Sequence, residues 1–118
     1  MTHTIETKRI YDPISADEGL RVLVDRLWPR GVSKSKAALD LWLKDVAPST
    51  ELRTWFAHRL DRWDEFRERY LLELQKSVAV EELRTLAHAG PVTLLYGARD
   101  RSHNEAVVLA AFLRDSTP

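Results

Sequence analysis

Cysteine is absent from this sequence of 118 residues. Its absence excludes disulfide bonds, a thiolate nucleophile and any metal site with a cysteine ligand, and it suits a reducing compartment. The four histidines lack the spacing of a metal site, and neither the GxSxG nor the HExxH motif occurs. We therefore expect no bound metal and no cofactor, and the sequence leaves open whether the protein catalyses a reaction.

Excess charge and long apolar runs are absent as well. The 18 Lys and Arg residues balance the 18 Asp and Glu residues, so the molecule has no general attraction for nucleic acid or for a membrane surface. The longest apolar run covers only residues 106–113, which is too short to span a bilayer. Because the N-terminus is also polar and unlike a signal peptide, we expect a cytoplasmic protein without a membrane partner.

The remaining composition, 44% hydrophobic and 31% charged, is typical of one soluble domain, expected here over residues 1–118. Apolar runs or alternating patterns predict strands over 4–13, 20–24, 39–46 and 92–97, although a short helix would also fit 39–46. Helical spacing predicts helices over 51–59, 61–74, 80–89 and from about 103 onward. This order predicts an α/β fold, with a largely parallel sheet of about four strands and helices on both faces.

Capping residues indicate where these helices begin and end. The expected N-caps are Ser49 or Thr50 for the first helix and Asp61 for the second. Gly90 is expected to end the third helix in the left-handed conformation. Ser102 and Glu105 have the spacing of a capping box, in which each side chain satisfies a free backbone amide at the start of the last helix.

Polar side chains follow two of the predicted strands, in the segments "VDRLWPRG" (24–31) and "YGARDRSHNE" (96–105). Ligands of open α/β sheets bind outside the carboxyl ends of the strands, so the two segments form one site if their strands are parallel neighbours. The cations of these segments and the start of the last helix favour an anion. We therefore predict a site for an anionic small molecule, with acid–base chemistry as an option. The candidate acid–base residues are Asp25, Asp100 and His103, and the candidate ligand contacts are Arg26, Trp28, Arg30, Arg99 and Asn104.

Structural roles compete with this interpretation. Asp25 could form an ion pair with Arg26 or Arg30 at the strand end, and Trp28 could simply cover the edge of the sheet. The position of Arg30 separates the two interpretations. In a binding site it faces solvent or ligand across from Asp100, whereas in a purely structural corner it is paired with Asp25.

Two further functions remain open at this point. A nucleic-acid accessory module would place the basic residues Arg26, Arg30, Lys34 and Lys36 against phosphates, although the net charge of zero speaks against it. An oligomerising interaction module would use exposed tryptophans. Trp28 and Trp42 are the aromatic residues near the basic segment that have no evident place in the core.

Four sequence blocks carry a family resemblance: "RVLVDRLWPRG", "LWLKDVAPSTELRTWF", "RWDEFRERY" and "GPVTLLYGARD". Together they resemble the YeaO-like branch of the domain-of-unknown-function 488 family over almost the whole chain. The resemblance implies a compact, single-domain bacterial α/β protein and assigns no reaction to it. The segment from Asp25 to Gly31 matches the branch at Asp25, Arg26, Trp28, Pro29, Arg30 and Gly31.

Departures from the family pattern concern the predicted site. The wider family usually ends the late strand in a cysteine and opens the next helix with Cys-His-Arg, where this chain has Tyr96 and Asn104-Glu105-Ala106, so thiol chemistry is not carried over. The YeaO-like branch usually has Asn-His-Ala at that helix start and His-Asp where this chain has His58-Arg59. These departures argue against a shared catalytic mechanism, and the capping box offers a structural role for Glu105.

Overall fold

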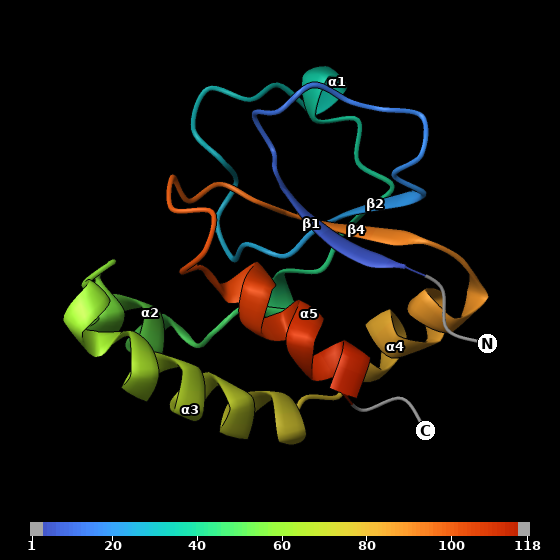
Figure 1. The fold of residues 1–118 in the computed structure, drawn as a ribbon. Coiled ribbons are helices and arrows are strands. Elements are labelled where there is room, and N and C mark those ends of the chain that lie inside the picture. Colours follow the sequence, from blue (N-terminus) through green and yellow to red (C-terminus); the bar gives the residue numbers. More distant parts are fainter. Residues whose placement is uncertain (1–3, 116–118) are drawn as a thin grey trace.

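A four-stranded parallel sheet forms the centre of the fold (Figure 1). The computed structural model describes residues 4–115. The strand order is β1-β4-β2-β3, and all three pairings are parallel. This confirms the predicted α/β class and the largely parallel sheet. In chain order the elements are β1 (Ile5–Arg9), β2 (Leu20–Leu23), α1 (Lys34–Ala37), β3 (Leu41–Trp42), the 3-10 turn η1 (Lys44–Val46), α2 (Thr50–Phe56), the 3-10 turn η2 (Leu60–Arg62), α3 (Trp63–Gln75), α4 (Ala79–Ala89), β4 (Val92–Tyr96) and α5 (Glu105–Asp115).

Strand β4 is the most buried element, because it pairs with β1 on one side and with β2 on the other. All five of its residues are buried. Successive side chains of a strand point to opposite faces. Accordingly Val22 and Leu94 join the larger hydrophobic core, whereas Leu23 and Leu95 join a smaller core on the other face. The near-continuous apolar runs of β2 and β4 are therefore explained by a sheet that is covered on both faces.

The two faces of the sheet are covered unequally. Helices α2, α3, α4 and α5 lie together on one face, and only α1 and loops lie on the other (Figure 1). Phe66, Tyr70 and Leu74 of α3 are buried in the larger core, as their helical spacing predicts. Helices therefore lie on both faces, as predicted, but the second face carries only the single turn of α1.

Helix starts agree only in part with the capping signals. Ser49 caps α2, since its hydroxyl accepts the amide proton of Leu52. The prediction that Asp61 caps α3 is wrong, because Arg62 occupies the N-cap position and the carboxylate of Asp61 accepts hydrogen bonds from Arg59.

Two chain boundaries also differ from the predictions. Gly90 is extended, with a φ of 178°, and not left-handed. The physical reason is that Pro91 follows it, and the residue before a proline avoids helical conformations. Strand β3 keeps only residues 41–42 of the predicted 39–46, because the chain turns into η1 two residues later.

No helix within residues 4–115 has the length and apolar character needed to cross a membrane.

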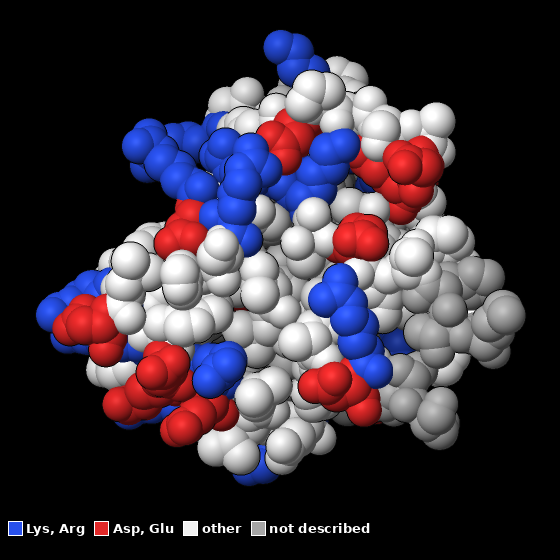
Figure 2. Space-filling model, in the orientation of Figure 1, with Lys and Arg blue, Asp and Glu red and all other residues white. Residues whose placement is uncertain are grey.

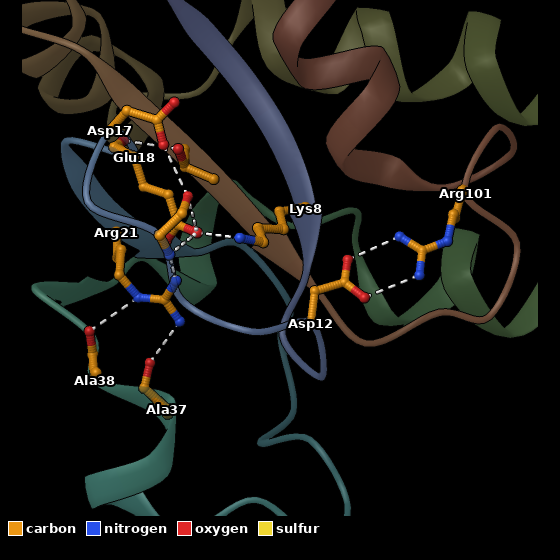
Figure 3. A network of polar contacts seen from close by, with 10 residues as sticks. Lys8, Asp12, Asp17, Glu18, Arg21, Ala37, Ala38 and Arg101 are labelled. Carbon is orange, nitrogen blue, oxygen red and sulfur yellow. Dashed lines mark hydrogen bonds and ion pairs between the residues drawn. The ribbon is translucent and has the colours of Figure 1, made fainter.

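A buried ion cluster ties β1, β2 and the end of α1 together (Figure 3). Glu18 and Arg21 are 7% and 6% exposed. Glu18 accepts hydrogen bonds from Lys8 and from Arg21. Arg21 also donates to the carbonyl oxygens of Ala37 at 2.8 Å and Ala38 at 3.1 Å. Both buried charges are thus paired, which is the condition under which ions are tolerated inside a protein.

The pKa of Glu18 records the balance of forces in this cluster. Burial raises it, but the hydrogen bonds from Lys8, from the amide of Ser15 and from Arg21 outweigh burial and lower the pKa from 4.5 to about 2. A carboxylate with a depressed folded-state pKa stabilises the fold above its unfolded pKa, and this contribution is lost as the pH falls through the folded value. The stabilisation by Glu18 is therefore present above pH 4.5 and disappears toward pH 2.

The Glu18→Gln substitution tests this cluster. We expect it to lower the free energy of unfolding by about 3–5 kcal/mol, because it leaves the buried Arg21 without its counter-ion. Denaturant unfolding at pH 7 measures the loss. The matched control is Asp12→Asn, which breaks the more exposed pair with Arg101 and should cost only about 0.2–1 kcal/mol. Equal losses in the two variants would contradict a structural role for the cluster.

Candidate functional site

A cavity of about 580 Å³ opens where β2 and β4 end. The segments that follow the two strands both line it, because parallel neighbours place their carboxyl ends at one edge of the sheet. Helix α2 and the residues just after it form another part of the lining. Of the residues predicted for the site, Asp25, Arg26, Trp28, Arg30, His103 and Asn104 line the cavity. Arg99 and Asp100 do not belong to the lining.

Two carboxyl groups from different elements meet in this cavity. Asp25 follows β2, and its Oδ2 accepts the amide proton of Gly97 at 2.8 Å. Glu105 is the first residue of α5, and its carboxyl forms a side-chain hydrogen bond with that of Asp25. We call Asp25 and Glu105 the acid pair. Two carboxyl groups in contact cannot both ionise without strong repulsion, so one proton is held between them.

The surroundings of Glu105 raise its pKa and favour its protonated form. Desolvation raises the pKa of Glu105 well above its usual value, and the hydrogen bond and the negative charge of Asp25 raise it further. The charge of Arg53 acts in the opposite direction but does not cancel these effects. Carboxyl groups with such shifts are concentrated at functional sites.

The prediction that Glu105 forms a capping box with Ser102 is wrong. Asn104 caps α5 instead, because its Oδ1 accepts the amide proton of Val107 at 3.1 Å. The amide nitrogen of Asn104 donates to the carbonyl oxygen of Asp100 at 2.9 Å. Both polar atoms of Asn104 are therefore used inside the protein. Since Asn104 supplies the cap, the carboxyl of Glu105 faces Asp25.

Asp100 and His103, two of the candidate acid–base residues, contact each other just before α5. The Asp100 carboxylate accepts the amide protons of Ser102 and His103, and it lies 3.0 Å from Nδ1 of His103. The amide of Ser102, together with the other donors, lowers the pKa of Asp100. The ring of His103 also packs edge-on against Trp63, with the centroids 5.1 Å apart. These contacts orient an imidazole that lines the cavity, with Asp100 behind it.

The cavity arginines differ in how far their charges are already used. Arg26 donates to the carbonyl oxygens of Ala47 and Pro48, both at 3.2 Å, and so holds the chain segment that leads into α2. Arg30 and Arg53 are exposed, line the cavity and form no ion pair with any residue of 4–115. The purely structural interpretation required an ion pair between Arg30 and Asp25. The structure of residues 4–115 has no such pair.

Lys and Arg side chains gather on the side of the molecule where the loops after β2 and β4 lie (Figures 1 and 2). Sequence reasoning identified the arginines of the two loops but missed Arg53. Arg53 lies on the exposed side of α2. The local sequence pattern of α2 does not show that this side borders the cavity at the ends of β2 and β4.

His58 lines the cavity just after α2 in an unusual backbone conformation. Ala57 and His58 have φ values of 47° and 57°, in the left-handed region that residues with a Cβ seldom adopt. Such strained positions cluster at functional sites. His58 is a pocket residue, and its ring lies 6.1 Å from that of Phe56, which also lines the cavity.

The tryptophans near the basic segment have structural partners. Trp28 and Trp42 meet edge to face at 5.3 Å and pack against the smaller core. Their indole nitrogens donate to the carbonyl oxygens of Val32 and Asp25, both at 2.7 Å. Both tryptophans thus have structural partners, and Trp42 fixes the peptide of Asp25.

No group of three or more His, Cys, Asp or Glu residues within 4–115 is arranged to hold a metal ion.

Comparison with known proteins places the chain among close relatives. Residues 4–118 match the family model described as "Inactive DUF488-N3 subclade". The chain is 48% identical over 111 residues to the uncharacterized protein YeaO of Escherichia coli, an alignment covering 93% of this chain and 96% of the relative. It is 45% identical over 109 residues to the uncharacterized proteins Rv3073c of Mycobacterium tuberculosis and Mb3100c of Mycobacterium bovis, covering 92% of this chain and of each relative. No solved structure gives a significant match.

The Glu105→Gln substitution tests the acid pair. An acid with a raised folded-state pKa stabilises the fold at low pH, and this stabilisation is lost as the pH rises from 4.5 through the raised value. We expect the parent protein to lose up to about 1.4 kcal/mol per pH unit in that window. The variant should lack this part of the slope, because its amide does not titrate.

Denaturant unfolding at a series of pH values from 4 to 9 measures the slope. Glu51→Gln is the control, since Glu51 is an exposed residue of α2 that lies outside the cavity lining. An unchanged slope in Glu105→Gln would show that the pair shares no proton.

Proposed function

The chain belongs to the inactive DUF488-N3 subclade, and on that premise we propose that it binds an anionic small molecule at the carboxyl ends of β2 and β4 without transforming it. The observation that carries the proposal is the pair of arginines, Arg30 and Arg53, which line one cavity and form no ion pair within residues 4–115. A concave site with a few convergent polar groups is the usual form of a small-molecule site.

Arg30 and Arg53 suit a carboxylate or a phosphate. A guanidinium group offers several N–H donors in one plane, which match two oxygens of either anion. The two arginines come from different elements, the loop after β2 and helix α2. An anion between them would therefore be held from two sides. Arg26 supports this arrangement indirectly, because its hydrogen bonds to Ala47 and Pro48 position the segment before α2.

Binding without turnover agrees with the residues at the cavity. Tyr96 and Asn104 stand where the wider family resemblance implies cysteines, and Asn104 is used as a helix cap. Glu105 stands where the branch usually has a histidine, and it pairs with Asp25. His103 and Asp100 remain the groups best suited to acid–base work, since the imidazole is oriented by the carboxylate. The subclade description favours binding over this alternative.

The charge-reversing substitution Arg30→Glu tests the proposal. In the parent protein, phosphate, sulfate, acetate or citrate should raise the melting temperature, because a ligand that binds only the folded state stabilises it by RT ln(1 + [L]/Kd). Arg30→Glu should abolish this rise and leave the unliganded melting temperature nearly unchanged, since Arg30 is exposed. Differential scanning fluorimetry measures both quantities.

Arg99→Glu is the matched control, because Arg99 is an exposed arginine that lies outside the cavity lining. It should respond to the anions as the parent protein does. If no anion of the panel shifts the parent melting temperature, the proposal loses its support. Binding of single- or double-stranded nucleic acid that weakens steeply with salt would instead favour the accessory-module function.

A further inference from the structure

The cavity presents charge of both signs, and this narrows the class of ligand. We propose that the ligand is a zwitterion, in which a primary ammonium group binds the acid pair of Asp25 and Glu105 and an anionic group binds Arg30 and Arg53. This inference rests on the proposed function and adds the second half of the ligand to it. All four side chains line the same cavity, and they come from the loop after β2, from α2 and from α5.

The acid pair supplies hydrogen-bond acceptors that the protein does not use. Oδ2 of Asp25 accepts the amide proton of Gly97, and the carboxyl groups of Asp25 and Glu105 hydrogen-bond to each other, so the remaining lone pairs of the two groups are open to a ligand. An ionised carboxyl is an acceptor only, so the pair favours a ligand group rich in N–H donors. A purely anionic ligand would place its electron pairs against those of Asp25. An ammonium group instead offers three donors and the opposite charge.

A divalent cation is a poorer occupant of this place. The acid pair contributes two carboxyl groups, and no third His, Asp or Glu within residues 4–115 completes a set that could hold a metal. Ca²⁺ takes about six to eight oxygen ligands, and Mg²⁺ requires a near-octahedral shell. Two adjacent arginines would also repel a bare cation. The same arginines favour a ligand that brings an anion with its amine.

Binding of the ammonium group changes the protonation of the pair. The O–H bond of Glu105 breaks, its proton passes to the solvent, and the ligand nitrogen keeps its three hydrogens as donors to the two carboxylates. The net charge of the acid pair then falls by one and is balanced by the ammonium charge. A purely anionic ligand favours the opposite outcome, because retention of the proton reduces repulsion. Proton release on binding thus distinguishes the two ligand classes.

Several charged or titratable groups surround the acid pair and set the pH at which this release occurs. Their elements are the loop after β2, α2 with the residues that follow it, α3 and the start of α5. Arg26 and Arg30 lie in the loop after β2, Arg53 lies in α2, and His58 follows that helix. Tyr70 belongs to α3, and His103 with its partner Asp100 lies at the start of α5. The charge of Arg53 favours release of the proton, whereas desolvation opposes it.

Matched probes test the proposal on the full chain. One set is 2-aminoethyl phosphate, ethyl phosphate and ethanolamine, and the other is 4-aminobutanoate, butanoate and butylamine. We expect the zwitterion of at least one set to bind about tenfold or more tightly than its anion, because a hydrogen bond to a charged group contributes more than a neutral one. Isothermal titration calorimetry with the carboxylate set, in two buffers of different ionisation enthalpy, should show release of about one proton with 4-aminobutanoate and none with butanoate.

Substitutions in the acid pair locate the effect. Glu105→Gln and Asp25→Asn should each remove the preference for the zwitterion. Glu51→Gln, on α2 outside the cavity lining, should retain the preference. Because proton release is measured on the parent protein, the test does not depend on the folding of either variant.

The possible results separate the two proposals. Zwitterions that bind no tighter than their anions, or that release no proton, would overturn the further inference and leave the anion site intact. A preference that survives Glu105→Gln would also overturn it. If neither anions nor zwitterions bind, both the further inference and the proposed function are contradicted.

Discussion

The hydrogen bond from the amide of Gly97 to the carboxylate of Asp25 is the contact on which the site depends. The backbone ladder between β2 and β4 ends with the bond from Val24 to Leu95 at 3.0 Å. Beyond it the carbonyl of Asp25 is occupied by Trp42. The side chain of Asp25 therefore continues the connection between the two strand ends where the backbone cannot. This hydrogen bond fixes the carboxylate of Asp25 at the ends of the two strands, where Glu105, the first residue of α5, contacts it. The acid pair therefore depends on the pairing of β2 with β4.

Two glutamates show how the same side chain behaves in different surroundings. Glu18 is buried among donors from Lys8, Ser15 and Arg21, so its negative charge is stabilised and its pKa falls. Glu105 is desolvated beside another carboxyl, so its pKa rises. The first arrangement strengthens the fold, and the second weakens it at neutral pH. Local features of the second kind, together with the left-handed backbone at Ala57 and His58, are expected where a protein gives up stability for a site.

The sheet was predictable from the sequence, because β2 and β4 are buried on both faces and read as apolar runs. The meeting of the segments after them followed from the rule for parallel sheets. Glu105 was misjudged because the spacing to Ser102 fits a capping box, and sequence alone does not show that Asn104 is the better-placed cap. Arg53 was missed because its neighbours in the cavity are distant in sequence, and only tertiary packing brings them together. The omission of Arg53 thus concerns a contact that no local rule encodes.

The strand order has a consequence for how the chain folds. Strand β4 is the next-to-last element, yet β1 and β2 are both joined to the sheet through it. The pairing of β1 with β4 brings Ile5 beside Val92, so it closes a loop of about three quarters of the chain. Non-local pairings of this kind form slowly. During synthesis the helices between β1 and β4 therefore cannot pack their apolar faces on the complete sheet until β4, in the last quarter of the chain, has been made.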